Sequence, residues 1–394
     1  MSTPFINDSF GIVAVLVTVP AVIFTLTSHP KFVKFFSIVP PLVFAYFIPT
    51  LLSNANIIPT QHETYSYIKN YILPASLLLL TLSVDIKGIF KLGYKAVVML
   101  LAATAGVVIG GPIAYFIFKS GLPADAWKGF AALAGSWIGG GANFIAVGNS
   151  VGASDSIIGM MVIIDVLVAN IWTGILLYLA GKEKQIDKFM GADNSSIQEL
   201  KDKMINFQEE TKRVATAKDY MVMVSLAFLF TWISAKLGNL LPPIGDIISH
   251  GTWKIILITT FGVIFSFTPL RNYEGAGASK IGTLFLYILI GTIGANADVI
   301  QVFSYPYLFF TGAVWIMIHI AIITLIMWLI KAPLFFMAVG SQANIGGAAS
   351  APIVASAFHP ALATVGVMMG IAGYVLGTYC ALICAALLKW VDLI

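Results

Sequence analysis

Ten apolar runs of about 20 residues constrain this chain more than any other feature. As an α-helix, a run of that length spans the hydrocarbon core of a bilayer, about 30 Å thick. Only 10% of the 394 residues are charged, and no polar stretch is long enough for a soluble enzyme domain. We therefore expect an all-α polytopic membrane protein. The expected spanning helices are 10–28, 35–53, 66–84, 95–118, 156–180, 219–238, 252–270, 279–297, 306–330 and 361–388.

Two further apolar segments, 128–152 and 333–358, are interrupted by Gly, Asn, Ser and Pro. The first contains "GSWIGGGANFIAVGNSVG" at 135–152. Each segment either crosses once as an unwound helix or enters and returns on the same side as a re-entrant hairpin. Non-helical backbone at membrane depth is tolerated only where protein or a water-filled cavity surrounds it. These two segments are therefore the first place to look for a functional site.

The distribution of Lys and Arg favours re-entrant hairpins, because cytoplasmic loops of membrane proteins are rich in these residues. With the N-terminus outside and both segments re-entrant, most of the 22 basic residues fall in cytoplasmic loops. Full crossing would move Lys31, Lys34 and the cluster 87–95 to the wrong side. The polar linker 182–218 is then cytoplasmic. Within it, Ile197, Leu200, Met204 and Phe207 have the spacing of a short amphipathic helix, although a plain linker fits the pattern too.

An internal repeat relates residues 1–181 to residues 219–394, on either side of that linker. The stretch "LLTLSVDIKGI" (79–89) aligns with "LIGTIGANADV" (289–299), which places Asp85 opposite Asn296. The stretch "GGGANFIAVGNS" (139–150) aligns with "GSQANIGGAASA" (340–351) and pairs Asn143 with Asn344. A shift of four residues instead pairs the two Gly-Ser dipeptides at 135–136 and 340–341. Each half has five crossing helices and one broken segment, so the second half is inverted relative to the first.

Inverted repeats with a matched pair of interrupted helices are typical of secondary transporters. The freed carbonyl and N–H groups, together with Asn, Gln and Ser side chains, can bind an ion or a polar solute, and half-helix N-termini suit a carboxylate. The alternative is that Gly, Ala and Ser only allow tight helix packing, but that explains one such run better than two matched runs. The predicted substrate-binding residues are Ser136, Gly140, Gly141, Asn143, Ser341, Gln342, Asn344, Gly346 and Gly347.

Asp165 is the acidic residue deepest in an apolar span, where a charge costs about 2.5–3.5 kcal/mol or more. We expect it to face a cavity and to bind a cation or carry a proton, with a structural hydrogen bond as the alternative. Asn143, Asn344 and Asn296 join it as predicted coupling residues, and Na⁺ could also use carbonyls of the broken helices. His319 lies in the middle of a span. We expect a neutral histidine whose ring nitrogens have hydrogen-bond partners, with a proton carrier as the alternative.

The sequence lacks the motifs of several functional classes of protein. The sequence has no phosphate-binding loop, no HExxH and no CxxC, and its net charge of +4 indicates no nucleic-acid partner. We expect no enzyme activity and no cofactor besides a coupling ion, Na⁺ or H⁺. The competing hypothesis is an ion channel, because glycine-rich re-entrant segments also form filters, or a membrane sensor built on a carrier fold. An intramembrane hydrolase is the weakest alternative.

The two Gly-Asn segments, together with "GTLFLYILIGTIGANADV" (282–299), resemble the bacterial domain-of-unknown-function family 819, the YjcL-like predicted membrane proteins. More distantly, the layout is similar to sodium:glutamate and 2-hydroxycarboxylate (citrate) symporters. This resemblance implies a homodimeric, Na⁺- or H⁺-coupled elevator-type carrier in the bacterial cytoplasmic membrane, with a small polar solute such as an organic acid, amino acid or small peptide. It points to 139–143 and 340–344, with Gly346 and Gly347. Unlike those symporters, this chain has no arginine near either segment.

Overall fold

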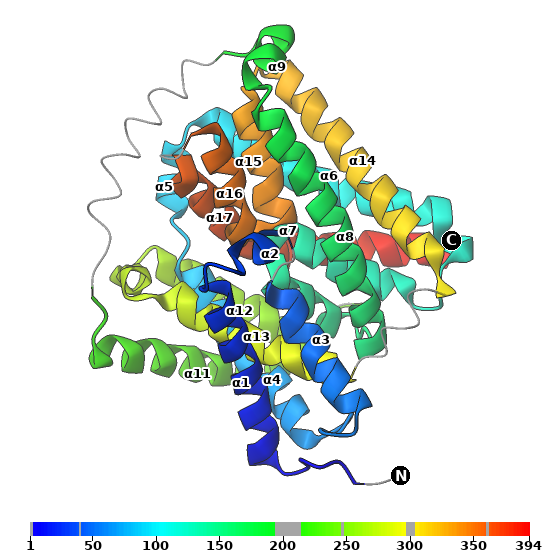
Figure 1. Cartoon of the computed structure of the whole chain (residues 1–394), viewed down its shortest axis with the longest axis vertical. Helices are drawn as coiled ribbons and strands as arrows, with labels where there is room; N and C mark the ends of the chain where they lie inside the picture. The colour runs from blue at the N-terminus through cyan, green and yellow to red at the C-terminus, as the bar shows by residue number, and fades with distance from the viewer. Residues whose placement is uncertain (1–2, 39–40, 194–213, 246–247, 297–303, 360–361) are drawn as a thin grey trace.

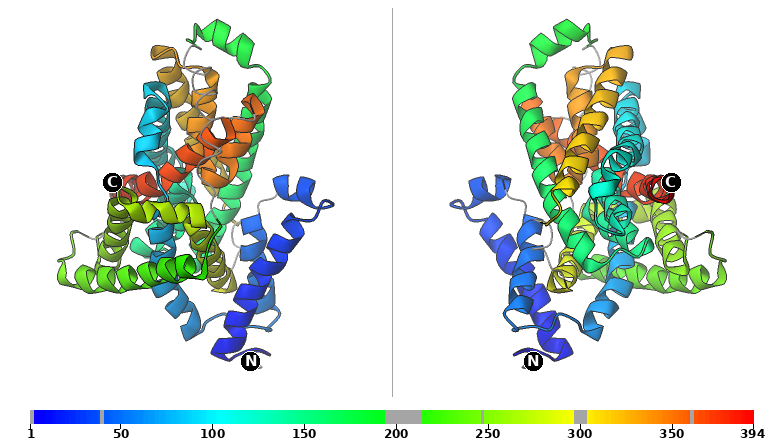
Figure 2. Two further views of the ribbon diagram at one scale, coloured as in Figure 1. Left: turned by 90° about the vertical axis from the view of Figure 1, so that its left-hand side faces the viewer. Right: turned by 90° about the vertical axis from the view of Figure 1, so that its right-hand side faces the viewer.

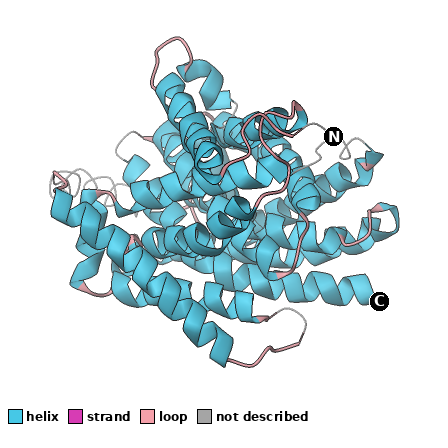
Figure 3. Ribbon diagram, turned by 90° about the horizontal axis from the view of Figure 1, so that it is seen from below, coloured by secondary structure: helices cyan, strands magenta, loops and turns pink. Residues whose placement is uncertain are grey.

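The protein is built from α-helices, as the apolar runs predict. The computed structural model describes residues 3–38, 41–193, 214–245, 248–296, 304–359 and 362–394. Within these residues there is no β-strand beyond one isolated bridge between Ile244 and Ile248 (Figure 3). The proposed amphipathic helix around 197–207 lies outside the described residues.

The helices follow the predicted boundaries closely. The first half contains α1 (Ser9–Thr27), α2 (Val33–Ile38), α3 (Pro41–Asn54), α4 (Glu63–Leu82), α5 (Ile86–Lys91), α6 (Tyr94–Phe118), η1 (Lys119–Gly121), α7 (Ala126–Ser150) and α8 (Asp155–Ala180). The linker begins with α9 (Glu183–Met190). The second half contains α11 (Ala217–Leu240), α12 (His250–Ser266), η2 (Pro269–Ala276), α13 (Ala278–Asn296), α14 (Pro306–Leu329), α15 (Leu334–Ile345), α16 (Gly347–Phe358) and α17 (Ala363–Leu393).

Eight helices of the described chain are long and apolar enough to cross a membrane, and a ninth results if α12 and η2, joined at 94°, count as one span. One of the eight is α7, so seven of the ten expected spans meet that standard alone, the span 252–270 meets it only when α12 is joined to η2, and two fall short. The helix α3 has only 14 residues, and the first half of α4 carries Glu63, Lys69 and Asn70 among its tyrosines. The protein is a polytopic membrane protein, but the span count of ten is not reproduced by these criteria.

The segment 128–152 folds back on itself, although its length alone would allow α7 to cross. Gly140 interrupts α7 with φ 72° and ψ −174°, a conformation essentially limited to glycine. A methyl group on Gly148 would lie 3.2 Å from the Cβ of Ala132. In a straight helix these residues would stand about 24 Å apart along the axis. The segment is therefore a helical hairpin, here called hairpin 1, with Gly140 at its tip.

The segment 333–358 is a second helical hairpin, here called hairpin 2, made of α15 and α16. Gly347 turns the chain with φ 61°. The Gln342 Nε2 donates a hydrogen bond to Ser350 Oγ across the turn at 2.7 Å, and the rings of Phe335 and Phe358 pack at 5.5 Å near the open end. Both broken segments thus fold as the glycine-rich hairpins that the sequence predicts.

The helices assemble into two bodies, and each body takes helices from both halves of the chain. The scaffold body contains α1, α3, α4, α11, α12 and α13. The hairpin body contains α6, α7, α8, α14, α15, α16 and α17. Figure 1 shows the scaffold body in the lower part and the hairpin body in the upper part, and the side views of Figure 2 keep this division.

The two hairpins enter the hairpin body from opposite ends. Ser150, at the base of hairpin 1, accepts a hydrogen bond through its carbonyl from Thr252, and the chain then starts α8 at Asp155. At the base of hairpin 2, the N–H of Leu334 donates to Asp187 in α9, the helix that follows α8. Since α8 has 26 residues and a length of about 39 Å, the two bases lie a membrane thickness apart.

Candidate functional site

The tips of the two hairpins meet inside the protein. A Cβ on Gly347 would lie 3.8 Å from the Cα of Gly140. Both arms of hairpin 1 and the first arm of hairpin 2, α15, are almost entirely buried, whereas α16 is only partly buried and Gly140, Gly141 and Gly346 are partly exposed. A Cβ on Gly141 would touch Leu42 of α3 and Leu286 of α13, so the tip of hairpin 1 faces the scaffold body. The predicted site residues of the two halves therefore converge where the two bodies meet.

The helix α17 packs against both hairpins and lets them approach each other closely. A Cβ on Gly373 would lie 2.6 Å from the carbonyl oxygen of Ile138 in hairpin 1 and 3.3 Å from that of Ala343 in hairpin 2. A Cβ on Gly370 would lie 2.6 Å from the Cα of Ala348. A larger residue at either position would push a hairpin tip away from its partner.

Asn143 fastens hairpin 1 to α17. Its Nδ2 donates to the carbonyls of Gly139 at 3.1 Å and Tyr374 at 3.0 Å, and its Oδ1 accepts from Thr378 Oγ1 at 2.6 Å. The side chain is fully buried, and both amide hydrogens are used. In this conformation Asn143 therefore supports the tip rather than presenting its amide to a ligand.

Asn344 fastens hairpin 2 to α6 in the same manner. Its Nδ2 donates to the carbonyls of Gly340 at 3.0 Å and Leu100 at 3.3 Å, and its Oδ1 accepts from Thr104 Oγ1 at 2.8 Å. Like Asn143, it is fully buried and bonds to a glycine four residues earlier.

The hairpin geometry decides the register of the repeat. Asn143 follows the tip at Gly140, whereas Asn344 precedes the tip at Gly346–Gly347. Pairing Asn143 with Asn344 is therefore wrong as an alignment of the two hairpins. The alternative pairing, which matches Gly135–Ser136 with Gly340–Ser341, sets Gly140 opposite Ile345 and so brings the two tips to within two residues of each other. The resemblance between the asparagines lies in their contacts and not in their position along the hairpin.

Asp165 in α8 contacts the first arm of hairpin 1. Its Oδ2 accepts a hydrogen bond from Ser136 Oγ at 2.6 Å, and its Oδ1 accepts one from Trp137 Nε1 at 2.8 Å. Ser136 precedes the tip by four residues, about 6 Å along the helix axis. Two donors thus hold the carboxylate one helical turn from the tip, and each oxygen keeps lone-pair capacity for a cation or proton.

The matching serine of hairpin 2 has a different environment. Ser341 Oγ accepts a hydrogen bond from Trp172 Nε1 at 2.8 Å and lies 2.8 Å from His319 Nε2. His319 is therefore tied to hairpin 2 through Nε2, while its Nδ1 is buried without a hydrogen-bond partner among the described residues. Gln342 Nε2 donates to Thr173 and Ser350, but its Oε1 is buried without a hydrogen-bond partner. A buried acceptor without a partner is costly, so Gln342 is the predicted substrate-binding residue best suited to accept from a bound solute.

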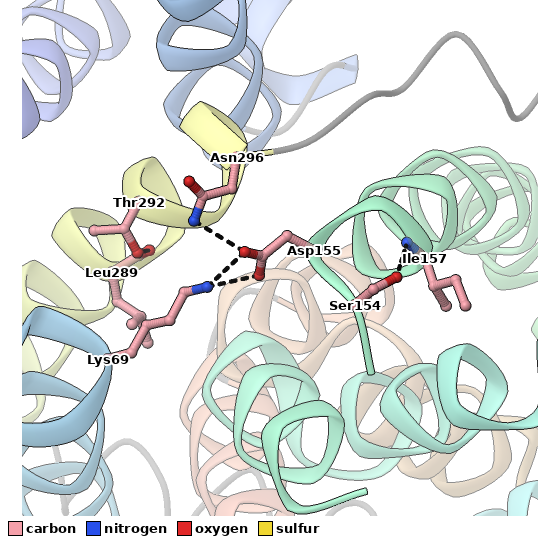
Figure 4. Close-up of polar contacts among 7 residues, drawn as sticks. All are labelled: Lys69, Ser154, Asp155, Ile157, Leu289, Thr292 and Asn296. Atoms are coloured by element: carbon pink, nitrogen blue, oxygen red, sulfur yellow. Dashed lines mark hydrogen bonds and ion pairs between the residues drawn. The ribbon is translucent and has the colours of Figure 1, made fainter. Parts of the chain in front are cut away.

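Asn296 does not lie with Asp165. Its Nδ2 donates to Asp155 Oδ2 at 2.9 Å, and Lys69 Nζ donates to both oxygens of the same carboxylate at 2.7 Å (Figure 4). Asp155 and Asp165 are ten residues apart on α8, about 15 Å along its axis. The cluster of Lys69, Asp155 and Asn296 joins the two bodies at the open end of hairpin 1. The internal repeat aligns Asp85 with Asn296. In the structure, Asp85 caps α5 and forms an ion pair with Arg271 at 2.5 Å.

Among the described residues, no group of three or more His, Cys, Asp or Glu side chains is placed to hold a metal ion. The prediction of Na⁺ at the broken helices depends on backbone oxygens instead. Because Gly140 leaves the helical conformation, carbonyls before it and N–H groups after it lose their intrahelical partners. The tips therefore offer a ligand neutral carbonyl and N–H groups, with the carboxylate of Asp165 nearby.

Comparison with known proteins places this architecture in a family. Residues 14–391 match the family described as "Protein of unknown function (DUF819)". The chain belongs to this family. It is also 23% identical over 351 residues to the uncharacterized membrane protein YjcL of Bacillus subtilis (strain 168), covering 84% of this chain and 85% of YjcL. The family expected from the Gly-Asn segments is thus confirmed.

Sequence patterns do not predict the residues that hold the hairpins in place, which are Trp137, Thr104, Thr378 and Lys69. Thr378 and Thr104 contact asparagines that are 235 and 240 residues away along the chain. Single threonines in apolar helices carry no periodic signal. Trp137 could have been found, because it adjoins Ser136 inside the glycine-rich run.

Proposed function

We propose that the protein is a secondary active transporter that couples uptake of a small polar solute to a Na⁺ or H⁺ gradient. The observation that carries this proposal is the contact between the two hairpin tips at the boundary of the two bodies. Broken helices that meet at mid-depth are the sites that secondary transporters use for substrates and ions. Here the solute would contact the tips and Gln342, and the ion would be held beside Asp165.

The division into two bodies supports an elevator-type movement in which the hairpin body slides against the scaffold body. Hydroxyl pairs lie on the boundary: Thr259 and Thr378 are 3.2 Å apart, and Thr260 and Tyr379 are 2.8 Å apart. Neutral hydroxyl contacts exchange readily for others. Coupling requires that the ion favours the state able to bind solute, because a ligand shifts an equilibrium only by its differential affinity.

We propose an orientation with hairpin 1 opening outward and hairpin 2 opening to the cytoplasm. Lys95, which pairs with Asp193 at 2.9 Å, and Lys331 lie at the end where hairpin 2 begins. A basic end of this kind faces the cytoplasm in most membrane proteins. We further propose that the protein resides in the bacterial cytoplasmic membrane as a homodimer.

The proposal is tested by uptake of labelled organic acids, amino acids and small peptides into proteoliposomes, with an imposed Na⁺ or H⁺ gradient or none. Gradient-dependent accumulation of at least one solute is the expected result. Absence of flux for every solute under both gradients would contradict transport. Single-channel currents in planar bilayers would support the channel hypothesis instead, since carriers do not reach such rates.

A further inference from the structure

The open end of hairpin 1 contains two neighbouring cavities with different electrostatic character. The larger, about 710 Å³, is lined by Glu63, Asp155, Lys69 and Asn296 among others. The smaller, about 270 Å³, is lined by Lys69 and Lys254 but by no carboxylate. Lys69 and Ser66 border both cavities. The charge therefore changes from mixed at the larger cavity to positive at the smaller one.

The two lysines keep unused donors. Lys69 Nζ donates to both oxygens of Asp155, and Lys254 Nζ donates to the carbonyl of Asn70 at 3.2 Å. An ammonium group has three N–H donors. Among the described residues, Lys254 has no carboxylate within ion-pair distance. Both residues lie within the first two turns of their helices, where a long Lys side chain can extend its ammonium group to the membrane boundary.

We propose that the smaller cavity binds a small carboxylate anion between Lys69 and Lys254. Hairpin 1 contributes Asn149, an exposed residue whose side-chain amide can donate to a carboxylate, and the nearly buried Leu73 and Ile255 complete the lining. A cation would meet two ammonium groups, and a neutral solute would leave Lys254 without a counter-charge, since Lys69 alone is paired with Asp155. The volume limits the ligand to a small metabolite.

This site links anion binding to the contact between the two bodies. Lys69 and Lys254 belong to the scaffold body, whereas Asp155 and Asn149 belong to the hairpin body. A bound carboxylate competes with Asp155 for Lys69 and so weakens the ion pair that joins the bodies. Lys69 and Asp155 are 20% and 24% exposed, so this ion pair is partly screened and can be broken. The smaller cavity would be an entry site for anionic solutes. This claim about the substrate class rests on the transport function proposed above.

The test uses the full chain in phosphatidylcholine nanodiscs, with acetate as the probe and saturation-transfer NMR of its methyl resonance as the readout. We expect saturable binding of acetate and none of acetamide, its neutral isostere. Lys254→Gln and Lys69→Gln should each weaken acetate binding by about tenfold, since a charge-assisted hydrogen bond is lost. Asp155→Asn should strengthen it, because Lys69 is released. Lys236→Gln, at an exposed position on α11, is the matched control and should change nothing.

Three results would overturn the site: unchanged acetate affinity in Lys254→Gln, equal binding of acetamide, or weaker binding in Asp155→Asn. Displacement of acetate by phosphatidylglycerol added to the nanodiscs would assign the cavity to a lipid headgroup and also overturn it. The two proposals fail separately. Acetate binding without solute flux would contradict transport alone, and gradient-driven uptake of a neutral solute without acetate binding would contradict only the anion site.

Discussion

The two hairpins use the same backbone device with different chemistry. Both reverse at glycine, both are fastened by a buried asparagine to a threonine on a neighbouring helix, and both place a serine before the tip. In hairpin 1 that serine faces the carboxylate of Asp165, whereas in hairpin 2 it faces an imidazole and an indole. The shared features shape the place where the two tips meet. The difference supports our proposal that the coupling ion binds beside Asp165 at hairpin 1 and that the solute contacts Gln342 of hairpin 2.

The largest effect on transport should come from removing the negative charge of Asp165, beside hairpin 1. Asp165→Asn keeps the shape of the side chain and its contacts with Ser136 and Trp137, so the protein should still fold. Because the negative charge is gone, we expect gradient-driven uptake to fall by at least about tenfold, the factor that corresponds to about 1.4 kcal/mol. His319→Gln at hairpin 2 is the matched variant and should retain gradient dependence. The measurement is initial uptake rate in proteoliposomes. Equal losses of gradient dependence in both variants would remove the proposed asymmetry.

Asn143 and Asn344 should contribute equally to the stability of the folded protein. Asn143→Ala and Asn344→Ala each leave a buried threonine hydroxyl and backbone carbonyls without partners, so each should lower the free energy of unfolding by about 3 kcal/mol. Denaturant titration of the purified variants gives both values. A loss in only one of them would show that the hairpins are not fastened equivalently.

The glycine tips should tolerate substitution unequally. Gly140→Ala forces a side chain into φ 72° and ψ −174° and should cost about 2 kcal/mol. Gly347→Ala, at φ 61°, occupies the milder left-handed region and should cost about 1 kcal/mol. Neither added Cβ would clash, so the cost is one of backbone conformation. The control is Gly174→Ala on an open face of α8, which should be neutral or slightly stabilising. The reverse order of the two tip variants would contradict the geometry described here.

The sequence predicts much of this arrangement because membrane helices obey strong local rules. Apolar length placed the spans to within a few residues for helices such as α8 and α14. Runs of glycine beside asparagine located both hairpins, since only protein-enclosed backbone can depart from helix at membrane depth.

The remaining features depend on contacts between distant parts of the chain. Matching the letters Ala-Asn paired Asn143 with Asn344, but residue identity does not reveal on which side of a turn a residue lies. The environment of Asn296 depends on Lys69 and Asp155, which approach it only after both halves pack together. Asp165 has hydrogen bonds of the kind that the alternative expected, while cation or proton binding there stays a prediction; its partners, Ser136 and Trp137, could be named only once hairpin 1 was folded.

The most direct test of the central claim probes the two hairpin tips from both sides of the membrane. Single cysteines at Gly141 and at Ala349, an exposed residue beside the second tip, are introduced after Cys380 and Cys384 are replaced by alanine. They are then treated with a membrane-impermeant thiol reagent in right-side-out and inside-out vesicles, with and without Na⁺ and solute. We predict that both cysteines are labelled and that the side giving faster labelling changes with the ligands. Two cysteines that stay unreactive, or that react from one fixed side under every condition, would contradict a shared central site with alternating access.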